Sequence, residues 1–362
     1  MDPLAVPVPG SFDDLTPSWL QAALVGGGLD ADIEVAAVVV EPLGRSVGFL
    51  GDLARLNVTY GRGRGPASLI VKLPTTDPGG YQVGTMLRAW AREVAFYQEV
   101  APASPGARVP SCYYAGGDPP IGGSGGRWVV VLEDCPSEPI DVGVGATPAQ
   151  ARAAVDALAG FHATWWASDR TFDWMPGFDT TGVGGLQGPW LDAIPLFLER
   201  YGHVVPEPTG EWLVEFAPLL SQWSDRVATE PLTVVHADYR LDNLLIGDTG
   251  VTMIDWQTAL RGPGAMDLSS FIATSLTVEQ RRASEAELIA RYRRALEAEG
   301  VGIHPDWLDR SYDENLLWWM GQFANNLARL EPPEAEAQRA LDTMIERTYT
   351  AALDRNVGRL LG

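Results

Sequence analysis

The order of its secondary-structure patterns constrains this chain more than any other feature. A short helix is predicted first, with Thr16 as N-cap and Pro17 at its first position, ending near Val25. Short β-rich runs follow, separated by Gly, Pro and Asp clusters, at residues 35–40, 53–60, 68–73, 109–114 and 127–132. A helical pattern over Thr85–Val100 lies between the third and fourth runs. These patterns predict a small five-stranded antiparallel sheet with one main helix.

After residues 133–136 the balance changes to helices. The first begins at Thr147 and Pro148, another N-cap and first-position pair. The helical patterns cover about residues 147–166, 190–201, 211–228, 278–299, 306–330 and 333–355. One β interruption, at residues 232–236, 243–246 and 251–254, lies among them. We therefore expect a bilobal α+β fold, with an N-terminal lobe over residues 1–134 and a mostly helical C-terminal lobe over residues 135–362.

Composition excludes several classes of partner. The chain has 362 residues and a formal net charge of -21, which disfavours binding to nucleic acid or to an anionic membrane. Its longest apolar runs are of strand length, far below the roughly 18 residues that span a bilayer. The first residues lack the basic and apolar pattern of a secretion signal, so we expect a cytoplasmic protein. Cys112 and Cys135 are interpreted as reduced thiols.

The segment 234–245 carries the chemistry. It places Asp238 after an apolar strand and Asn243 five residues later, and Asp255 ends the next strand. Phosphoryl transfer from ATP needs a carboxylate that accepts the proton of the attacking hydroxyl, and oxygen ligands for Mg²⁺. Asp238 is the candidate base, Asn243 and Asp255 are candidate metal ligands, and His236 would brace the loop. An Asp-rich turn after a strand, without any catalytic role, is the alternative.

The run His-Ala-Asp-Tyr-Arg-Leu-Asp-Asn-Leu-Leu at 236–245, with Ile-Asp-Trp-Gln at 254–257, resembles the catalytic loop and metal-binding aspartate of the aminoglycoside phosphotransferase and choline kinase superfamily. Its bacterial and ecdysteroid-kinase-like branches are the most similar. The resemblance implies a protein-kinase-like fold, with ATP and Mg²⁺ as cofactors. Ala237 stands where the family usually has glycine. This departure concerns the backbone angles of the loop, because alanine resists a positive φ. Asp267 matches a family aspartate that ties down the loop backbone; a helix N-cap is the other interpretation.

The same resemblance implies a lysine on an inner strand and a glutamate on the following helix that orients it. Twenty-five of the 26 basic residues are arginine, and the only lysine, Lys72, lies in the apolar run Leu69–Leu73. Glu93 lies on the predicted helix that follows. An ammonium among apolar neighbours needs a phosphate or a carboxylate as a partner. Lys72 is therefore predicted to contact ATP phosphates, with Glu93 as its orienting partner.

Four further predictions concern contacts at the nucleotide and in the core. Gly44, Ser46 and Gly48 lie in a loop whose backbone would cover the phosphates, although a hairpin turn also explains its glycines. Backbone groups of Glu133 and Cys135 would bond adenine, as the resemblance implies. Arg240 would steady the transferred phosphoryl group or form a surface salt bridge. His162 is predicted to be a core residue.

Together these residues predict an ATP-dependent small-molecule kinase. A nucleotide-binding module without catalysis is the alternative. A protein kinase is disfavoured, because the eleven residues between Asp255 and Asp267 leave little room for an activation segment. We expect a monomer or homodimer.

The expected acceptor is a hydroxylated small molecule, such as an antibiotic, a sterol-like compound or another metabolite alcohol. Several tryptophans of the second lobe would line an apolar pocket for it or belong to the core. They are Trp165, Trp166, Trp174, Trp190, Trp318 and Trp319.

Overall fold

The computed structural model describes residues 6–43, 50–118, 126–137, 140–247, 250–330 and 335–362. The chain forms two compact units. Unit 1 comprises Met1–Ser137 and Thr252–Thr258, and unit 2 comprises Glu138–Val251 and Ala259–Gly362. The division therefore lies three residues beyond the predicted boundary at residue 134. Thr252–Thr258, which the prediction assigned to the second lobe, group with the first unit.

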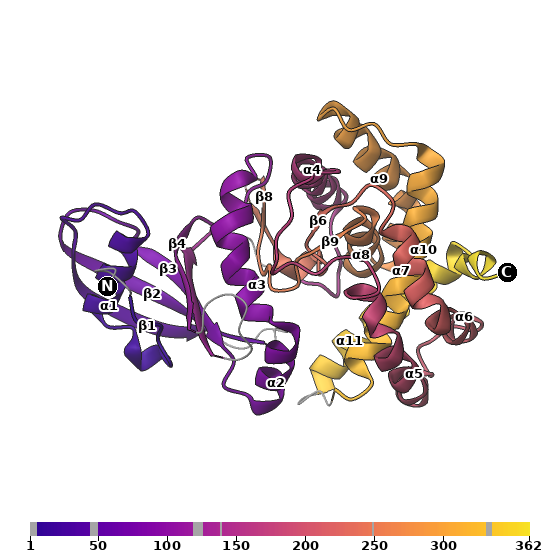
Figure 1. Ribbon diagram of the computed structural model, residues 1–362, viewed down its shortest axis with the longest axis horizontal. Coiled ribbons are helices and arrows are strands. Elements are labelled where there is room, and N and C mark those ends of the chain that lie inside the picture. Colours follow the sequence, from indigo (N-terminus) through magenta and orange to yellow (C-terminus); the bar gives the residue numbers. More distant parts are fainter. Residues whose placement is uncertain (1–5, 44–49, 119–125, 138–139, 248–249, 331–334) are drawn as a thin grey trace. The chain divides into compact units, whose positions relative to one another are not determined.

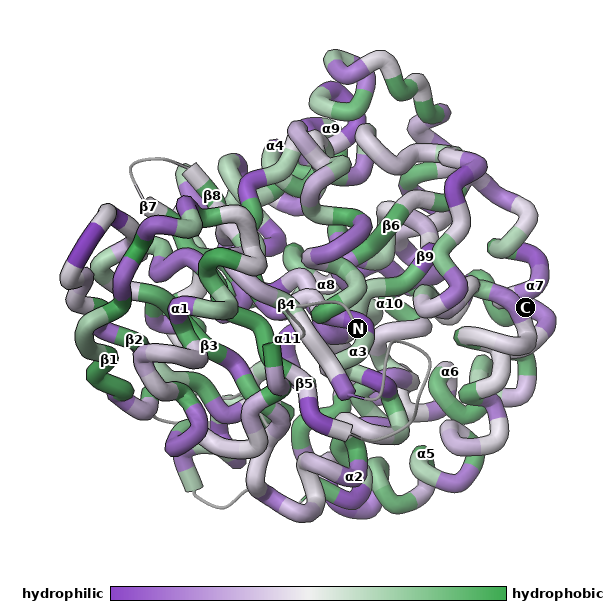
Figure 2. The backbone as a smooth tube through the Cα atoms, turned by 60° about the vertical axis from the view of Figure 1, so that its left-hand side comes forward, coloured by the Kyte–Doolittle hydropathy of each residue, from purple (hydrophilic) through white to green (hydrophobic). Residues whose placement is uncertain are grey.

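Unit 1 contains the predicted five-stranded antiparallel sheet (Figure 1). Its strands lie in the order β1 (Glu34–Leu43), β2 (Gly51–Arg62), β3 (Ser68–Pro74), β5 (Arg127–Glu133) and β4 (Cys112–Asp118). Each strand pairs antiparallel with its neighbours. Burial alternates along the middle of β2, as expected of a strand whose two faces differ, and Figure 2 shows both hydrophobic and hydrophilic residues in β1 to β3.

The two faces of this sheet have different partners. Alternate residues of β2, β3 and β5, among them Leu56, Val71 and Val131, form a buried cluster with Leu20 and Leu24 of α1 (Pro17–Gly26). The Thr16 hydroxyl accepts from the Trp19 N–H at 3.2 Å, so the predicted N-cap is confirmed. Because successive side chains alternate, the residues between the clustered ones face the opposite side, where α3 (Ala89–Ala95) contacts β4 and β5.

The helix predicted over Thr85–Val100 is wrong in its bounds. It begins earlier, as α2 (Pro78–Leu87), because the Asp77 carboxylate accepts from the Gly80 N–H at 2.7 Å and caps it. It then breaks at Arg88, which has a left-handed φ of 54°, before α3. A π-helical turn, Phe96–Val100, completes the segment.

Unit 2 is mostly helical, as predicted. Its long helices are α4 (Pro148–Trp165), α5 (Gln187–Tyr201), α9 (Val278–Ala298), α10 (Pro305–Leu327) and α11 (Ala335–Asp354). The helix predicted over 211–228 is interrupted near Pro218, which separates α6 (Thr209–Phe216) from α7 (Leu220–Val227). The strands are β6 (Thr233–Val235), β7 (Leu244–Gly247), β8 (Gly250–Met253), which ends in unit 1, and β9 (Leu260–Gly262).

Sequence reasoning missed β9 and α8 (Ala265–Ser275). Every residue of α8 is buried, and Gly264 caps the helix without a side-chain hydrogen bond, so the segment lacks the N-cap signal of the predicted helices. Within the part of the chain that the structure describes, no helix combines the length and apolar character needed to cross a membrane.

Candidate functional site

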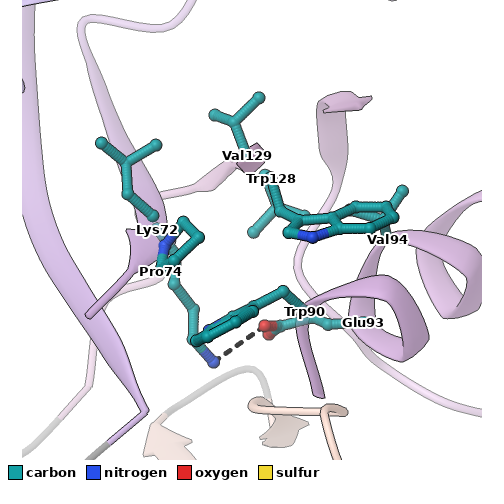
Figure 3. A pocket seen from close by; sticks show the side chains of 9 residues that line it. Lys72, Pro74, Trp90, Glu93, Val94, Trp128 and Val129 are labelled. Atoms are coloured by element: carbon teal, nitrogen blue, oxygen red, sulfur yellow. Dashed lines mark ion pairs between the residues drawn. The ribbon is translucent and has the colours of Figure 1, made fainter. Parts of the chain in front are cut away.

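Lys72 lies on the face of β3 that α3 covers. Its Nζ is 2.8 Å from Oε2 of Glu93 and 2.7 Å from Oδ1 of Asp255 (Figure 3 draws the first contact). The three residues come from a strand, a helix and the segment after β8, and all belong to unit 1. One ammonium is thus held between two carboxylates that are far apart in the sequence.

This cluster is almost closed to solvent, with Lys72 and Glu93 buried and Asp255 partly exposed. Burial opposes the charge of Lys72, but the charges of Asp255 and Glu93 raise the pKa of Lys72 above its ordinary value. Burial raises the pKa of Glu93 to about 6, although Lys72 lowers it. Lys72 is therefore a cation, and Glu93 is an anion at neutral pH.

The slot around Lys72 is narrow. A Cβ on Gly51 would lie 2.7 Å from Cε of Lys72, so only glycine leaves room for the lysine chain at that position. Lys72, Trp90, Glu93, Val94 and Trp128 line a small pocket, and Figure 3 shows the two indole rings beside the Lys72 and Glu93 side chains. The Trp90 indole N–H donates to the Leu50 carbonyl at 2.6 Å. Sequence reasoning counted Gly51 among the glycines of the phosphate-covering loop but did not predict its contact with Lys72, because its neighbour across the sheet was unknown.

Asp255 is held by the residues around it. It has a left-handed φ of 66°. The Met253 N–H donates to the Arg108 carbonyl at 2.9 Å, and the Trp256 ring stacks on Phe96 with centroids 3.9 Å apart. These contacts explain why Thr252–Thr258 group with unit 1. They also maintain a backbone conformation that costs about 1–3 kcal/mol for a residue with a side chain.

In unit 2 the loop after β6 forms a second charged cluster. Nε of Arg240 donates to Oδ1 of Asp238 at 2.7 Å, and Nη2 of Arg240 lies 3.1 Å from Oδ2 of Asp242. The Asn243 side-chain amide donates to the Asp238 carbonyl at 2.8 Å and to its Oδ2 at 2.9 Å. Burial raises the pKa of Asp238; Arg240 lowers it and Asp242 raises it further.

Asp267 fixes the backbone of this loop. Its carboxylate accepts from the N–H groups of His236 at 2.6 Å and Ala237 at 2.8 Å. Ala237 has φ 58°, the left-handed region that alanine resists and glycine favours. The cap of α8 is Gly264 and Asp267 is the third helical residue, so the N-cap interpretation of Asp267 is wrong.

His162 is fully buried, as predicted for a core residue. Its Nε2 lies 3.2 Å from the Asp267 carboxylate and its Nδ1 lies 2.7 Å from the Tyr292 hydroxyl. A tautomer with the proton on Nε2 satisfies both contacts, because it donates to the carboxylate and accepts from the hydroxyl. His162 and Tyr292 thus orient the residue that holds the loop.

The remaining predicted site residues lie as follows. Gly44, Ser46 and Gly48 fall outside the described residues. The Glu133 N–H donates to the Ser111 carbonyl at 2.8 Å, so a ligand would have to use its carbonyl; Cys135 is buried just after β5. Arg240 contacts two carboxylates of its own loop.

The large-lobe tryptophans are mostly core. Trp166 is half-buried and the rest are buried: Trp165, Trp174, Trp190, Trp318 and Trp319. Trp318 packs edge-on against Trp319 with centroids 4.6 Å apart, and a Cβ on Gly321 would lie 2.0 Å from the Trp190 ring. The packing therefore accounts for these residues without a ligand.

The five-stranded sheet of unit 1 and the mostly helical unit 2 are those of a protein-kinase-like fold. The sequence model of the phosphotransferase enzyme family matches residues 54–309, and the chain belongs to this family. The prediction of a phosphotransferase with an alcohol group as acceptor is thereby confirmed. No curated protein matches the chain in a sequence search.

Solved structures show the same fold at low identity. A choline kinase from Cryptosporidium parvum Iowa II is 10% identical, with a TM-score of 0.55 and 94% of each chain covered. An ethanolamine kinase of Plasmodium vivax is 10% identical, with a TM-score of 0.51 and coverage of 95% of this chain and 89% of that one. An amicoumacin kinase in complex with AMP-PNP, Ca²⁺ and Ami is 15% identical, with a TM-score of 0.50 and coverage of 87% and 88%.

Proposed function

We propose that this enzyme transfers the γ-phosphoryl group of ATP directly to a hydroxyl of a small molecule. The observation that carries the proposal is the only lysine of the chain, buried between Glu93 and Asp255. A buried, pre-oriented ammonium supplies a compact positive charge for phosphate oxygens. Such an arrangement has no evident structural advantage, because a hydrophobic residue of similar size would avoid the cost of burying charges.

Asp238 is the proposed base. It would accept the proton of the acceptor hydroxyl while the new O–P bond forms and the bond from the γ-phosphorus to the β,γ-bridging oxygen breaks. Arg240 and Asn243 fix the orientation of its carboxylate through the contacts described above. The transfer is direct, so no phosphoryl-enzyme intermediate is needed.

The proposed metal ligands are Asn243 and Asp255. Asn243 makes its described hydrogen bonds through Nδ2, which leaves its Oδ1 for a cation. Oδ2 of Asp255 has only a long contact of 3.4 Å from the Gln257 amide. Both are hard oxygen donors of the kind Mg²⁺ prefers, so the residues fit the ion. When bound, Mg²⁺ would neutralise phosphate charge; no group of three His, Cys, Asp or Glu suited to a metal occurs among the described residues.

The proposed acceptor is an uncharged alcohol, such as an antibiotic, a sterol-like compound or another metabolite. A polycationic acceptor would need unpaired carboxylates. Two buried acids of α10 do not supply them, because Asp313 pairs with Arg355 at 2.6 Å and with Arg359, and Glu314 pairs with Arg226 at 2.7 Å.

A coupled assay of ADP release against a panel of hydroxylated compounds tests the proposal. Asp238→Asn should lower kcat by about 10²- to 10⁴-fold while leaving nucleotide binding intact. Lys72→Arg should fold normally yet lose most transfer, because arginine keeps the positive charge for Glu93 and Asp255 but replaces the compact ammonium at the phosphates by a planar guanidinium. Full activity of either folded variant would refute its assigned role. Nucleotide binding without transfer across the whole panel would favour the non-catalytic module.

A further inference from the structure

Two arginines of unit 1, Arg88 and Arg92, are half-buried and have no partner among the residues that the structure describes. Arg88 lies at the break between α2 and α3, and Arg92 lies one turn later on α3. Neither forms an ion pair, a hydrogen bond through its side chain or a cation–π contact with any described residue. Their Nε atoms are buried without an acceptor, and so is the hydroxyl of Thr85, three residues before Arg88.

This state is unusual within the chain. Other arginines that lack a partner in the described ranges are exposed, where water solvates them: Arg64, Arg152, Arg329 and Arg339. Arginines that are as buried as Arg92 are paired, as Arg281 is with Glu285 and Asp354. Burial of the Nε atoms of Arg88 and Arg92 therefore carries a desolvation cost that no hydrogen bond from the described residues offsets.

The two charges also oppose each other. The pKa of Arg92 is lowered to about 10, mainly because the side chain is buried and also because the positive charge of Arg88 is close to it. The left-handed φ of 54° at Arg88 adds a backbone cost of about 1–2 kcal/mol. In a chain with a net charge of -21, a pair of half-buried cations without an acid is not explained by folding alone.

The pair is distinct from the Lys72 cluster. Neighbouring residues of a helix point about 100° apart, so Arg92 leaves α3 in a different direction from Glu93, which reaches Lys72 at 2.8 Å. Glu93 is not among the charges that act on the pKa of Arg92. A ligand of the arginine pair would therefore be a second anion, separate from any phosphate held by Lys72.

We propose that Arg88 and Arg92 form a binding site for an oxyanion, a phosphate group or a small molecule that carries one. Two guanidinium groups match the two charges of a phosphate at neutral pH, and their planar forks suit its oxygens. A monocarboxylate would leave one positive charge uncompensated. The site is independent of phosphoryl transfer, because it can be occupied without nucleotide or acceptor.

The test is thermal unfolding of the intact protein in rising inorganic phosphate, with chloride at matched ionic strength as reference. Binding to the folded state should raise Tm by about 3 °C at ten times Kd. Arg88→Gln with Arg92→Gln should abolish this rise, and Arg92→Gln alone should weaken it at least tenfold in midpoint concentration. The control Arg152→Gln, at an exposed unpartnered arginine, should keep the full rise.

The outcomes separate this site from the transfer site. Lys72→Arg should keep the phosphate-dependent rise in Tm. The proposal would be overturned if Lys72→Arg lost this rise while the variant with both Arg88→Gln and Arg92→Gln kept it. A wild-type Tm that responds equally to phosphate and chloride would also overturn it. Glycerol 3-phosphate as a second probe distinguishes the source: an equal rise indicates a phosphorylated small molecule as ligand, and a rise with inorganic phosphate alone indicates the free anion.

Discussion

The two charged clusters have the same composition but different construction. In each, one cation lies between two carboxylates: Lys72 between Glu93 and Asp255, and Arg240 between Asp238 and Asp242. In the first cluster the side chains of Lys72 and Glu93 are 8% and 3% exposed. In the second, those of Arg240 and Asp238 are 19% and 29% exposed. Burial is thus the main physical difference between them.

They also differ in how the chain brings them together. Arg240 and Asp238 are two residues apart, whereas Lys72 and Asp255 are 183 apart. The loop cluster is local in sequence, and its Asp242 lies in the 3-10 helix Leu241–Asn243. The lysine cluster forms only when the sheet, α3 and the segment after β8 are all folded. The comparison teaches that the first cluster should contribute more to stability than the second.

The largest expected effect on stability is that of Lys72→Met. It leaves two carboxylates without their cation in a buried site, and we expect the free energy of unfolding to fall by about 3–5 kcal/mol. Arg240→Met, the matched change in the more exposed cluster, should cost about 1 kcal/mol. Urea unfolding of both variants measures the difference. Equal losses would show that burial does not distinguish the clusters.

Asp267→Asn tests what holds the loop cluster in place. The Asp267 carboxylate accepts from two backbone N–H groups, one on each oxygen. An asparagine amide has one oxygen and one NH₂ group, so one backbone N–H would face another donor. We therefore expect the free energy of unfolding to fall by about 2–3 kcal/mol. Asp242→Asn, with its single contact to Arg240, should change stability by less than about 1 kcal/mol. Chemical unfolding compares the two. A neutral Asp267→Asn would mean that the loop needs no such support.

The lysine cluster should also respond to pH. The pKa of Glu93 is raised from 4.5 to about 6, so the folded state holds this proton more tightly than the unfolded chain does. The resulting stabilisation is complete below pH 4.5 and is lost as the pH rises through about 6. The Glu93→Gln variant has no carboxyl group at this position, so it lacks this pH-dependent contribution to stability. The stability of the wild type relative to Glu93→Gln should therefore fall by about 2 kcal/mol between pH 4.5 and 6.5, measured by urea unfolding. A difference independent of pH would contradict it.

The smallest expected effect is that of Ala237→Gly. Glycine removes the strain of φ 58° but increases the freedom of the unfolded chain, so a net gain of about 0.5 kcal/mol is expected. Ala283→Gly, at an exposed position within α9, should instead lose about 1 kcal/mol. Opposite signs in thermal unfolding would support the backbone argument. A loss at Ala237 as well would refute it.

Much of the fold could be predicted from periodicity and caps. The strand runs and the caps at Thr16 and Thr147 predicted elements that the structure contains. Prediction failed where those signals are absent. Helix α8 is capped by Gly264 without a side-chain hydrogen bond, so it lacks the N-cap signal present at Thr16 and Thr147. The break at Arg88 requires a left-handed residue, and arginine gives no indication of one.

The residues of the candidate site also fall into two groups, those that the sequence indicated and those that only the fold revealed. Residue types and spacing indicated Asp238, Asn243 and Asp255 as one chemical set, and the resemblance added Lys72 and Glu93. The contacts of Gly51 and Tyr292 had no signal in the sequence. Each depends on a neighbour across the fold, Lys72 Cε in one case and His162 in the other. A single sequence does not reveal such neighbours.

The sequence by itself determined that the charges of the loop cluster lie close together, because Asp238, Arg240 and Asp242 are within five residues of one another. It also determined that Lys72 lies in a buried strand, since apolar neighbours flank it. Only the tertiary structure decided which of the 47 acidic residues neutralise Lys72. The side of β3 on which Lys72 lies, the turn of α3 at Glu93 and the left-handed backbone at Asp255 select those partners. Tertiary structure alone also left Arg88 and Arg92 without an acidic partner among the described residues. The reason is physical: a buried charge is compensated by whatever the fold brings within a few ångströms, and distance along the chain does not specify it.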